Sequence, residues 1–384
     1  MLYFTLNVLH GFKKGEKTAA VYVDLEAAFD NVWRNGLLYL LHEAELRGNL
    51  LLFISSYLNH RTVRNLVNDH TSEWIQTRIG VPQGSVIAPL LFIFFIKDMT
   101  SKIPMYISFA DDLTIWLTHV NVDTLEKNMT APLTHIFSWC RKWRMKANHD
   151  KTDAMLLTPK GSTTINIKVE NKSLKQVAQK KCLGVVIDQN LNFNQHVDSL
   201  CSTALKAANK LSHILPHVNM KTGALLYTTL IRPHIERTFS IWAHTNITNL
   251  NKVCKVHRTA LQKITGAMHS TSTSALEVLS HIPPIQLRLE EVLINEFARI
   301  QAKPIGDPVK TLIQQLQNNE SFLDPRITTP IHSYQMIMAD FHQSDLLKNI
   351  ESQCDLSYKQ IQMKISTAVK IGEGLGSSTN RTAV

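Results

Sequence analysis

Residues 106–117 read Y-I-S-F-A-D-D-L-T-I-W-L, with two adjacent carboxylates between two apolar, strand-like runs. Asp111 and Asp112 fit the tip of a β-hairpin, because Asp side chains satisfy the backbone groups of tight turns. A chain of average composition also contains one adjacent acidic pair by chance. The stretch therefore predicts a hairpin, and any role for its carboxylates in chemistry needs support from elsewhere in the sequence.

A third carboxylate gives that support. Asp24 closes the apolar run A-A-V-Y-V-D at residues 19–24, where on its own it would be a turn residue or a helix N-cap. If Asp24, Asp111 and Asp112 lie on neighbouring strands, their negative charges repel one another, and this repulsion raises the pKa values of some of the three carboxyl groups. Divalent cations remove that repulsion, and Mg²⁺ favours a few carboxylates together with phosphate oxygens. Because two such ions roughly 4 Å apart assist in-line displacement at phosphorus, the three residues predict nucleotidyl transfer.

The surrounding chain alternates between β-rich and helical stretches up to about residue 190. Helical spacing of apolar residues predicts a helix over 123–143, and largely apolar or helix-like runs predict others over 48–58 and 85–100. Short strands are expected near 153–158, 164–169 and 182–187, and segment 61–85 is expected to form two strands and a Pro/Gly loop. A turn at Asn35-Gly36 should interrupt an earlier helical stretch. This alternation predicts an α+β fold with an antiparallel sheet.

Helical patterns dominate after about residue 190. Helices are expected over 196–215, 220–239 and 286–303, with a further stripe between Val253 and Ile264 that Gly266 ends. Ser274 and Glu277 match a capping box that would open another helix. We therefore divide the chain into residues 1–188, 189–303 and 304–384. The Gly/Ser/Thr-rich end of the last region is expected to be disordered.

Charge is concentrated in two blocks of the chain. The 384 residues carry a formal charge of +10, with eleven Lys/Arg against three Asp/Glu in residues 141–181. Residues 201–275 carry nine Lys/Arg against one Asp/Glu. A solvated surface is the ordinary explanation for any single lysine. Two basic blocks beside a neutral-to-acidic remainder indicate a polyanion such as nucleic acid.

Other features of the sequence exclude several classes of protein. The longest apolar run, residues 90–96, is too short to span a bilayer, so no membrane association is expected. The N-terminus has no basic region ahead of its apolar residues, and we expect an intracellular protein of the nucleus or cytoplasm. Five cysteines form no C-x-x-C pair, which indicates neither a zinc cluster nor a disulfide framework.

Several motifs resemble those of reverse transcriptases, in the family's order. V23-D-L-E-A-A-F-D30, G80-V-P-Q-G-S and F109-A-D-D112 are similar to motifs A, B and C. N148-H-D-K-T and K181-C-L-G-V-V-I-D fall where motifs D and E follow. The sequences of these motifs are most similar to those of non-LTR (LINE-type) retrotransposons, especially jockey-like elements, and the resemblance covers roughly residues 5–300. The resemblance implies a polymerase palm followed by an all-helical, thumb-like region.

The resemblance implies roles for residues at the matching positions. Asp24 and Asp111 would bind two Mg²⁺ ions, or Mn²⁺ in their place, and Asp112 is the adjacent motif carboxylate. Phe29 would lie under the sugar of the incoming dNTP and exclude a 2′-hydroxyl; otherwise it is a core aromatic. Gln83 and Gly84 would contact nucleotide or template, or else form a Pro-Gln-Gly loop without a ligand.

The same resemblance and the two basic blocks predict further residues that would contact the nucleotide or the nucleic acid. Lys151 would neutralise the triphosphate or protonate pyrophosphate, or it is one more lysine of the first basic block. Gly184 would help to seat the primer terminus. Within the second block, Lys252, Lys255 and Arg258 are predicted to contact the backbone of an RNA template and DNA primer. No obligatory protein partner is indicated.

The sequence also departs from the family's pattern. Twenty-three residues precede Asp24, whereas the resemblance implies finger segments with cations that grip the triphosphate, so we expect a shortened finger region. Two interpretations stay open. The chain is an RNA-directed DNA polymerase of a retrotransposon, with activity impaired by the missing fingers, or it is a degenerate or domesticated remnant that binds nucleic acid without catalysis.

Overall fold

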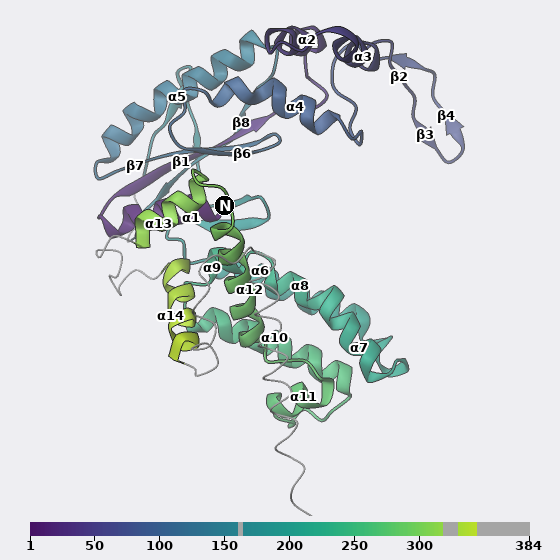
Figure 1. The fold of residues 1–384 in the computed structure, drawn as a ribbon, viewed down its shortest axis with the longest axis vertical. Helices are drawn as coiled ribbons and strands as arrows, with labels where there is room; N and C mark the ends of the chain where they lie inside the picture. The colour runs from purple at the N-terminus through teal and green to yellow at the C-terminus, as the bar shows by residue number, and fades with distance from the viewer. Residues whose placement is uncertain (160–163, 318–328, 344–384) are drawn as a thin grey trace, which may run out of the picture. The chain divides into compact units, whose positions relative to one another are not determined.

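The computed structural model describes residues 1–159, 164–317 and 329–343 (Figure 1). Contacts divide the chain into two compact units. The α/β unit comprises residues 14–184 and 188–190, and the helical unit comprises residues 1–13, 185–187 and those from 191 onward. Residues 1–13 thus group with the helical unit, whereas the sequence placed them with the palm.

A five-stranded sheet forms the centre of the α/β unit. Its order is β11-β8-β1-β7-β6, with β1 at Lys17–Leu25, β6 at Tyr106–Phe109, β7 at Asp112–His119, β8 at Ala147–Leu157 and β11 at Lys175–Gln176. β1 pairs antiparallel with both β7 and β8, β6 pairs antiparallel with β7, and β11 runs parallel to β8. The predicted α+β fold and the predicted hairpin at residues 106–117 are confirmed.

Two helices cover one face of this sheet (Figure 1). α4 (Ala88–Ile96) begins with Pro89 in its first turn, and α5 (Val122–Lys142) begins where the side chain of Asn121 accepts a bond from the Asp123 N–H. Their apolar side chains pack on alternate strand residues, such as Val21 and Leu113. Because successive strand residues point to opposite faces, the other face carries Tyr22 and Asp24.

The segment between β1 and α4 contains two helices and an exposed arm. α2 (Arg34–Glu43) runs through Asn35-Gly36, so the predicted turn there is wrong. A Cβ on Gly36 would lie 2.4 Å from the Trp33 ring, and glycine lets the helix pack against that ring. α3 spans Gly48–Leu58 as predicted.

The exposed arm follows α3 (Figure 1). Four two-residue strands form two nested antiparallel pairs, β2 (Thr62–Val63) with β5 (Ile75–Gln76) and β3 (Leu66–Val67) with β4 (His70–Thr71). The sequence predicted two strands around a polar turn here. Among the described residues, four further short strands are β9 (Lys168–Val169), β10 (Lys172–Ser173), β12 (Gln179–Cys182) and β13 (Val185–Asp188).

The helical unit consists of short and medium helices around its own apolar core. Its α-helices are α1 (Leu2–Lys13), α6 (Asn194–Leu211), α7 (Met220–Leu226), α8 (Arg232–Glu236), α9 (Phe239–Trp242), α10 (Ile247–Thr265), α11 (Thr273–Ser280), α12 (Ile285–Gln301), α13 (Pro308–Gln317) and α14 (Pro330–Gln343). Gly266 ends α10 in the left-handed region at φ +63°, as the sequence predicted.

Two predictions in the helical unit need correction. The single helix expected over 220–239 is α7, a π-helical turn η3 (Tyr227–Ile231) and α8, because Pro233 cannot donate a helical hydrogen bond. The N-cap of α11 is Ser272, whose hydroxyl accepts a bond from the Ala275 N–H at 3.3 Å, and not Ser274. Glu277 lies near His257, with Oε1 and Nε2 3.3 Å apart.

Among residues 1–159, 164–317 and 329–343, no helix is both long and apolar enough to cross a bilayer. Four of the five cysteines lie in these ranges, and Cys140, Cys182, Cys201 and Cys254 are free thiols. The predicted disorder of the Gly/Ser/Thr-rich end concerns residues that lie outside the described part of the chain.

Candidate active site

Two of the three predicted carboxylates lie beside each other at the end of the β1–β7 ladder. β1 and β7 pair in one unbroken register as far as Val23↔Leu113, and its next step sets Asp24 opposite Asp112. Directly opposed residues of antiparallel strands have side chains on the same face, with Cβ atoms about 4.5–5.5 Å apart. Asp24 and Asp112 therefore share the sheet face opposite to α4 and α5.

Asp111 is placed differently from the other two. It lies in the two-residue turn between β6 and β7, after Ala110 at φ +51°, and it is exposed. The sequence predicted that Asp24 and Asp111 share a metal site, with Asp112 as the adjacent carboxylate. The β1–β7 register continues toward Asp24 and Asp112 one step beyond its last pair, Val23↔Leu113, and the assignment of metal ligands among the three stays a prediction.

The three charges nevertheless act on one another. Partial burial raises the pKa of Asp112, and the negative charges of Asp111 and Asp24 raise it further. Lys180 on β12 opposes this effect, since its positive charge lowers the pKa of Asp112. The Lys180 Nζ lies 2.5 Å from Asp153 Oδ2, which fixes the ammonium near the carboxylates. Sequence reasoning missed Lys180, because it looked like one lysine of the first basic block.

The carboxylates suit a hard divalent cation but would not enclose one by themselves. In the described ranges, no group of three or more His, Cys, Asp or Glu side chains converges closely enough to hold a metal ion. Mg²⁺ usually takes only one or two carboxylates and completes its shell with water and substrate phosphates. The donor chemistry of Asp24 and its neighbours therefore fits Mg²⁺ that is bound together with a phosphate-bearing ligand.

Lys151 lies in an irregular stretch of β8 next to Asp24. The β1–β8 register shifts between the pairs Tyr22↔Asp153 and Asp24↔Asn148, so several β8 residues bulge out of the ladder. The Asn148 Oδ1 accepts from the backbone N–H groups of Asp150 and Lys151 at 3.0 and 3.1 Å, which shapes the bulge. The bulge leaves the Lys151 side chain exposed, and its role at a triphosphate stays a prediction.

Phe29 and the loop 77–84 lie together beyond the end of β1. The Phe29 ring is half-buried and stacks on Phe92 with centroids 4.3 Å apart, so the ring is held in place whatever else it contacts. Its carbonyl accepts from the Val81 N–H at 2.9 Å. Gln83 is exposed, and Gly84 has a φ of +85° with open space where a Cβ would lie. Contact of these residues with a nucleotide stays a prediction.

Gly184 follows Leu183 between β12 and β13. Both residues have positive φ values, +49° for Leu183 and +82° for Gly184. Two consecutive left-handed residues are typical of a tight two-residue turn, and glycine adopts this conformation without strain. The predicted role of Gly184 at the primer terminus concerns a ligand, and the backbone geometry leaves it a prediction.

The three predicted phosphate contacts on α10 differ in their availability. Lys255 is exposed, whereas the Lys252 Nζ lies 2.6 Å from Asp198. Arg258 donates to Thr273 Oγ1 and to the carbonyls of His269 and Thr271, so it ties the loop before α11 to α10. Lys255 is therefore the best placed of the three to contact a phosphate.

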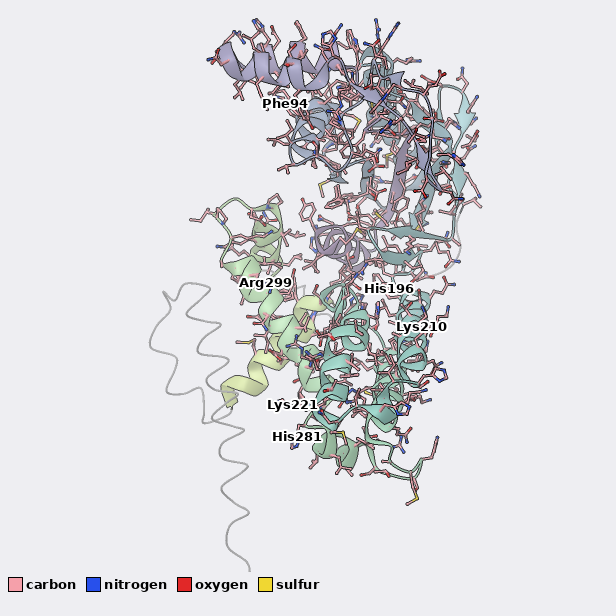
Figure 2. All side chains as sticks on the ribbon, turned by 90° about the vertical axis from the view of Figure 1, so that its right-hand side faces the viewer. Phe94, His196, Lys210, Lys221, His281 and Arg299 are labelled. Carbon is pink, nitrogen blue, oxygen red and sulfur yellow. The ribbon has the colours of Figure 1, made fainter. Side chains whose placement is uncertain are left out.

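A pocket of about 510 Å³ in the helical unit gathers other basic groups. Lys221, Arg232 and His281 line it together with Leu225, and Lys221 and His281 lie near each other in Figure 2. Arg232 also pairs with Glu236, with Nε and Oε1 2.7 Å apart. Sequence reasoning counted Lys221 and Arg232 in the second basic block but did not single them out.

Comparison with known proteins agrees with the motifs. Residues 5–187 match the family described as reverse transcriptase (RNA-dependent DNA polymerase). The probable RNA-directed DNA polymerase from transposon BS of Drosophila melanogaster is 27% identical over 278 residues, which cover 68% of this chain and 30% of that protein. The RNA-directed DNA polymerase from mobile element jockey of Drosophila funebris is 24% identical over 308 residues, covering 77% and 34%.

A solved structure is also similar at a lower level. The telomerase of Candida tropicalis, in complex with a fragment of telomeric RNA, gives a TM-score of 0.40 at 13% identity and covers 87% of this chain and 52% of its own. The chain spans about a third of the length of the curated relatives that it matches. The predicted resemblance to jockey-like elements is confirmed, and it is carried by residues 5–187, which match the reverse transcriptase family.

Proposed function

We propose that this chain is the RNA-directed DNA polymerase region of a non-LTR retrotransposon. It would join dNTPs to the 3′-hydroxyl of a DNA primer on an RNA template. The observation that carries the proposal is that Asp24 and Asp112 lie one step beyond the last β1–β7 pair, Val23↔Leu113, inside the segment that matches the reverse transcriptase family. Such an enzyme would act where its template and dNTPs are present, in the nucleus or the cytoplasm.

The proposed chemistry assigns a task to each part of the site. Asp24, Asp111 and Asp112 would supply the carboxylate oxygens for Mg²⁺ or Mn²⁺. Two such ions, when bound, stabilise the attacking and leaving oxygens of an in-line displacement. The primer 3′-oxygen would form a bond to the α-phosphorus, and the bond to pyrophosphate would break. Exposed Lys151 would offset the charge of the triphosphate, and Phe29, fixed by Phe92, would border the sugar.

Primer extension tests this proposal directly. Purified protein is incubated with a primed RNA, dNTPs and Mg²⁺, beside Asp24→Asn and the double variant Asp111→Asn/Asp112→Asn. Asp69→Asn is the control matched to Asp24→Asn, because Asp69 is an exposed carboxylate on the arm and its substitution removes the same single charge. Removing a group that stabilises developing charge costs about 100-fold or more in rate, so both active-site variants should lose extension.

Two results would contradict the proposal. Extension that persists in the double variant would place the chemistry at another site. Tight binding of primed RNA by the wild-type chain without any extension would instead identify a remnant that binds nucleic acid without catalysis.

A further inference from the structure

Arg34 is a buried cation that organises the loop 77–84. It is 5% exposed, and burial lowers the pKa of its guanidinium. Its Nε donates to the Gly80 carbonyl at 2.8 Å, and its Nη1 and Nη2 donate to the carbonyls of Thr77 at 2.7 Å and Ile79 at 2.8 Å. Nη2 also donates to Thr77 Oγ1 at 3.0 Å. One side chain of α2 thus satisfies most of the acceptors in the first half of the loop.

The backbone completes this attachment. The Gly80 N–H donates to the Val32 carbonyl at 2.8 Å, and the Val81 N–H donates to the Phe29 carbonyl at 2.9 Å. Gly80 has a φ of +84°, and a Cβ there would lie 2.7 Å from the Asp30 carbonyl oxygen. Segments 29–34 and 77–84, here called the clamp, therefore approach as closely as their backbones allow.

Gln83 is held at the exposed end of the clamp. Its Nε2 donates to both carboxylate oxygens of Asp30, at 3.0 and 3.1 Å. An ionised carboxylate can only accept, so Asp30 selects the amide orientation in which the nitrogen of Gln83 faces it. The same orientation turns the carbonyl oxygen Oε1 away from Asp30, where it can accept a hydrogen bond from a ligand.

We propose that Asp30 and Arg34 are positioning residues that hold Gln83 so that its Oε1 accepts a hydrogen bond from a hydroxyl or amino group of the incoming nucleotide. The inference rests on the proposed polymerase function and deepens it. Holding a flexible side chain in its binding geometry before the ligand arrives removes an ordering cost from the binding step. Asp30 acts on the direction of the amide, whereas Arg34 acts on the position of the loop that carries it.

Nucleotide affinity without chemistry is the appropriate measurement. A primer that ends in a dideoxynucleotide cannot be extended, so the Kd of dATP for the protein, primed RNA and Mg²⁺ can be titrated directly on a template that calls for adenine. In Asp30→Asn the new side chain can donate as well as accept, so Gln83 can turn over. We expect this variant to weaken dATP binding about tenfold, the effect of one hydrogen bond, with Asp69→Asn unchanged.

A double-mutant cycle separates positioning from a general electrostatic effect. If Asp30 acts through Gln83, then Asp30→Asn should add nothing in a Gln83→Ala background. Additive losses would overturn the proposal. ddATP, which lacks the 3′-hydroxyl, identifies the group that donates to Gln83. If the donor is the sugar 3′-hydroxyl, Asp30→Asn should not change the affinity for ddATP. If the donor is the amino group of the base, Asp30→Asn should weaken ddATP binding as much as dATP binding.

Hydrogen exchange tests the part played by Arg34 in the same full-length protein. Lysine retains the charge but cannot span four acceptors, so Arg34→Lys should speed exchange of the Gly80 and Val81 amides, whereas Arg47→Lys, at an exposed arginine, should not. Unchanged exchange would overturn the clamp. If the wild-type protein bound no dATP at all, both the polymerase proposal and the positioning role of Asp30 and Arg34 would fail. Normal dATP binding with an additive cycle would refute the positioning role alone.

Discussion

Asp112 illustrates how local structure affects the protonation of a single carboxyl group. Its pKa is raised by partial burial and by Asp111 and Asp24, so the folded protein holds the proton of this carboxyl more tightly than the unfolded chain does. Without metal, its contribution to stability therefore falls as the pH rises from about 4 through the raised pKa. A divalent cation would reverse this unfavourable contribution at neutral pH.

This gives a prediction that does not depend on activity. In EDTA at pH 7, Asp112→Asn should leave the protein as stable as wild type or more stable by less than about 1 kcal/mol, because the repulsion between exposed charges is screened. With Mg²⁺, wild type should gain in Tm and Asp112→Asn should gain less. Thermal unfolding with and without Mg²⁺ measures both effects, with Asp69→Asn as the control. Equal gains in all three proteins would argue against a metal site at Asp112.

Individual residues also show what the sequence could and could not predict. Asp24 was identified because it ends an apolar run and Asp112 because it lies between two such runs, patterns visible within a few residues. Arg34 and Lys180 were not, because their roles depend on acceptors and carboxylates far along the chain. Lys252 and Arg258 were singled out from their charge alone. The sequence did not show that Lys252 forms an ion pair with Asp198 or that Arg258 donates hydrogen bonds to the loop before α11, because these partners lie elsewhere along the chain.

At the scale of elements, helix ends were predicted less well than helix positions. The stripe of α10 and its stop at Gly266 are local signals, and they were predicted correctly. The polar run before α11 offers several serines and threonines as N-caps, and sequence spacing alone favoured Ser274 over Ser272. The choice is settled by where the chain meets α10, since Arg258 binds the loop just before Ser272.

The corrected cap can be tested by a matched pair of substitutions. Ser272→Ala removes the acceptor of the Ala275 N–H and should lower the free energy of unfolding by about 1 kcal/mol. Ser274→Ala, two residues inside the helix, should change it by less than about 0.5 kcal/mol. Urea unfolding at pH 7 measures both. The reverse order of losses would restore Ser274 as the cap.

α10 also carries a buried histidine that makes the stability of the helical unit depend on pH. His257 is 1% exposed, and its Nδ1 lies 2.6 Å from the Tyr227 hydroxyl. Burial and, to a lesser extent, the positive charge of Arg232 lower the pKa of His257 to about 4. Since the unfolded chain binds this proton more readily, stability should be lost as the pH falls from about 6.5 towards 4.

The loss at pH 5 should be on the order of 2 kcal/mol from His257, because its pKa is about 4 in the folded protein and about 6.5 in the unfolded chain. Urea unfolding at pH 7 and pH 5 would show it as a smaller difference between the two pH values in His257→Gln than in wild type. His213→Gln, at an exposed histidine of the same unit, is the control and should behave like wild type. Half-buried His244, whose pKa is also lowered to about 4 by the loss of solvent around its ring, should retain its share of the pH dependence.

At the scale of the whole molecule, charge is the property that the sequence predicts most directly. The chain carries a formal charge of +10, and its basic residues fall into two blocks. When lysine side chains bind the phosphates of a nucleic acid, the counterions of those phosphates are released. The affinity for primed RNA should therefore fall steeply with salt and depend little on base sequence. The fold decides which of the basic side chains remain available for this binding.

Lys255→Gln should therefore reduce the slope of log K against log salt by about one. Lys252→Gln should reduce it less, because Asp198 already neutralises that ammonium. Lys127→Gln is the control, since Lys127 is exposed and lies outside both basic blocks. Filter binding across a range of KCl concentrations measures the slopes. A slope that Lys255→Gln leaves unchanged would assign Lys255 to a solvated helix face.

The π-helical turn between α7 and α8 has a consequence for how this chain tolerates changes in length. A π turn holds one residue more than an α turn, so it stores an insertion without rotating the helix that follows. Deleting one residue from 228–230 should regularise the turn and leave Glu236 aimed at Arg288, whose Nε lies 2.8 Å from it. The same deletion in α10 would turn every later side chain of that helix by about 100°.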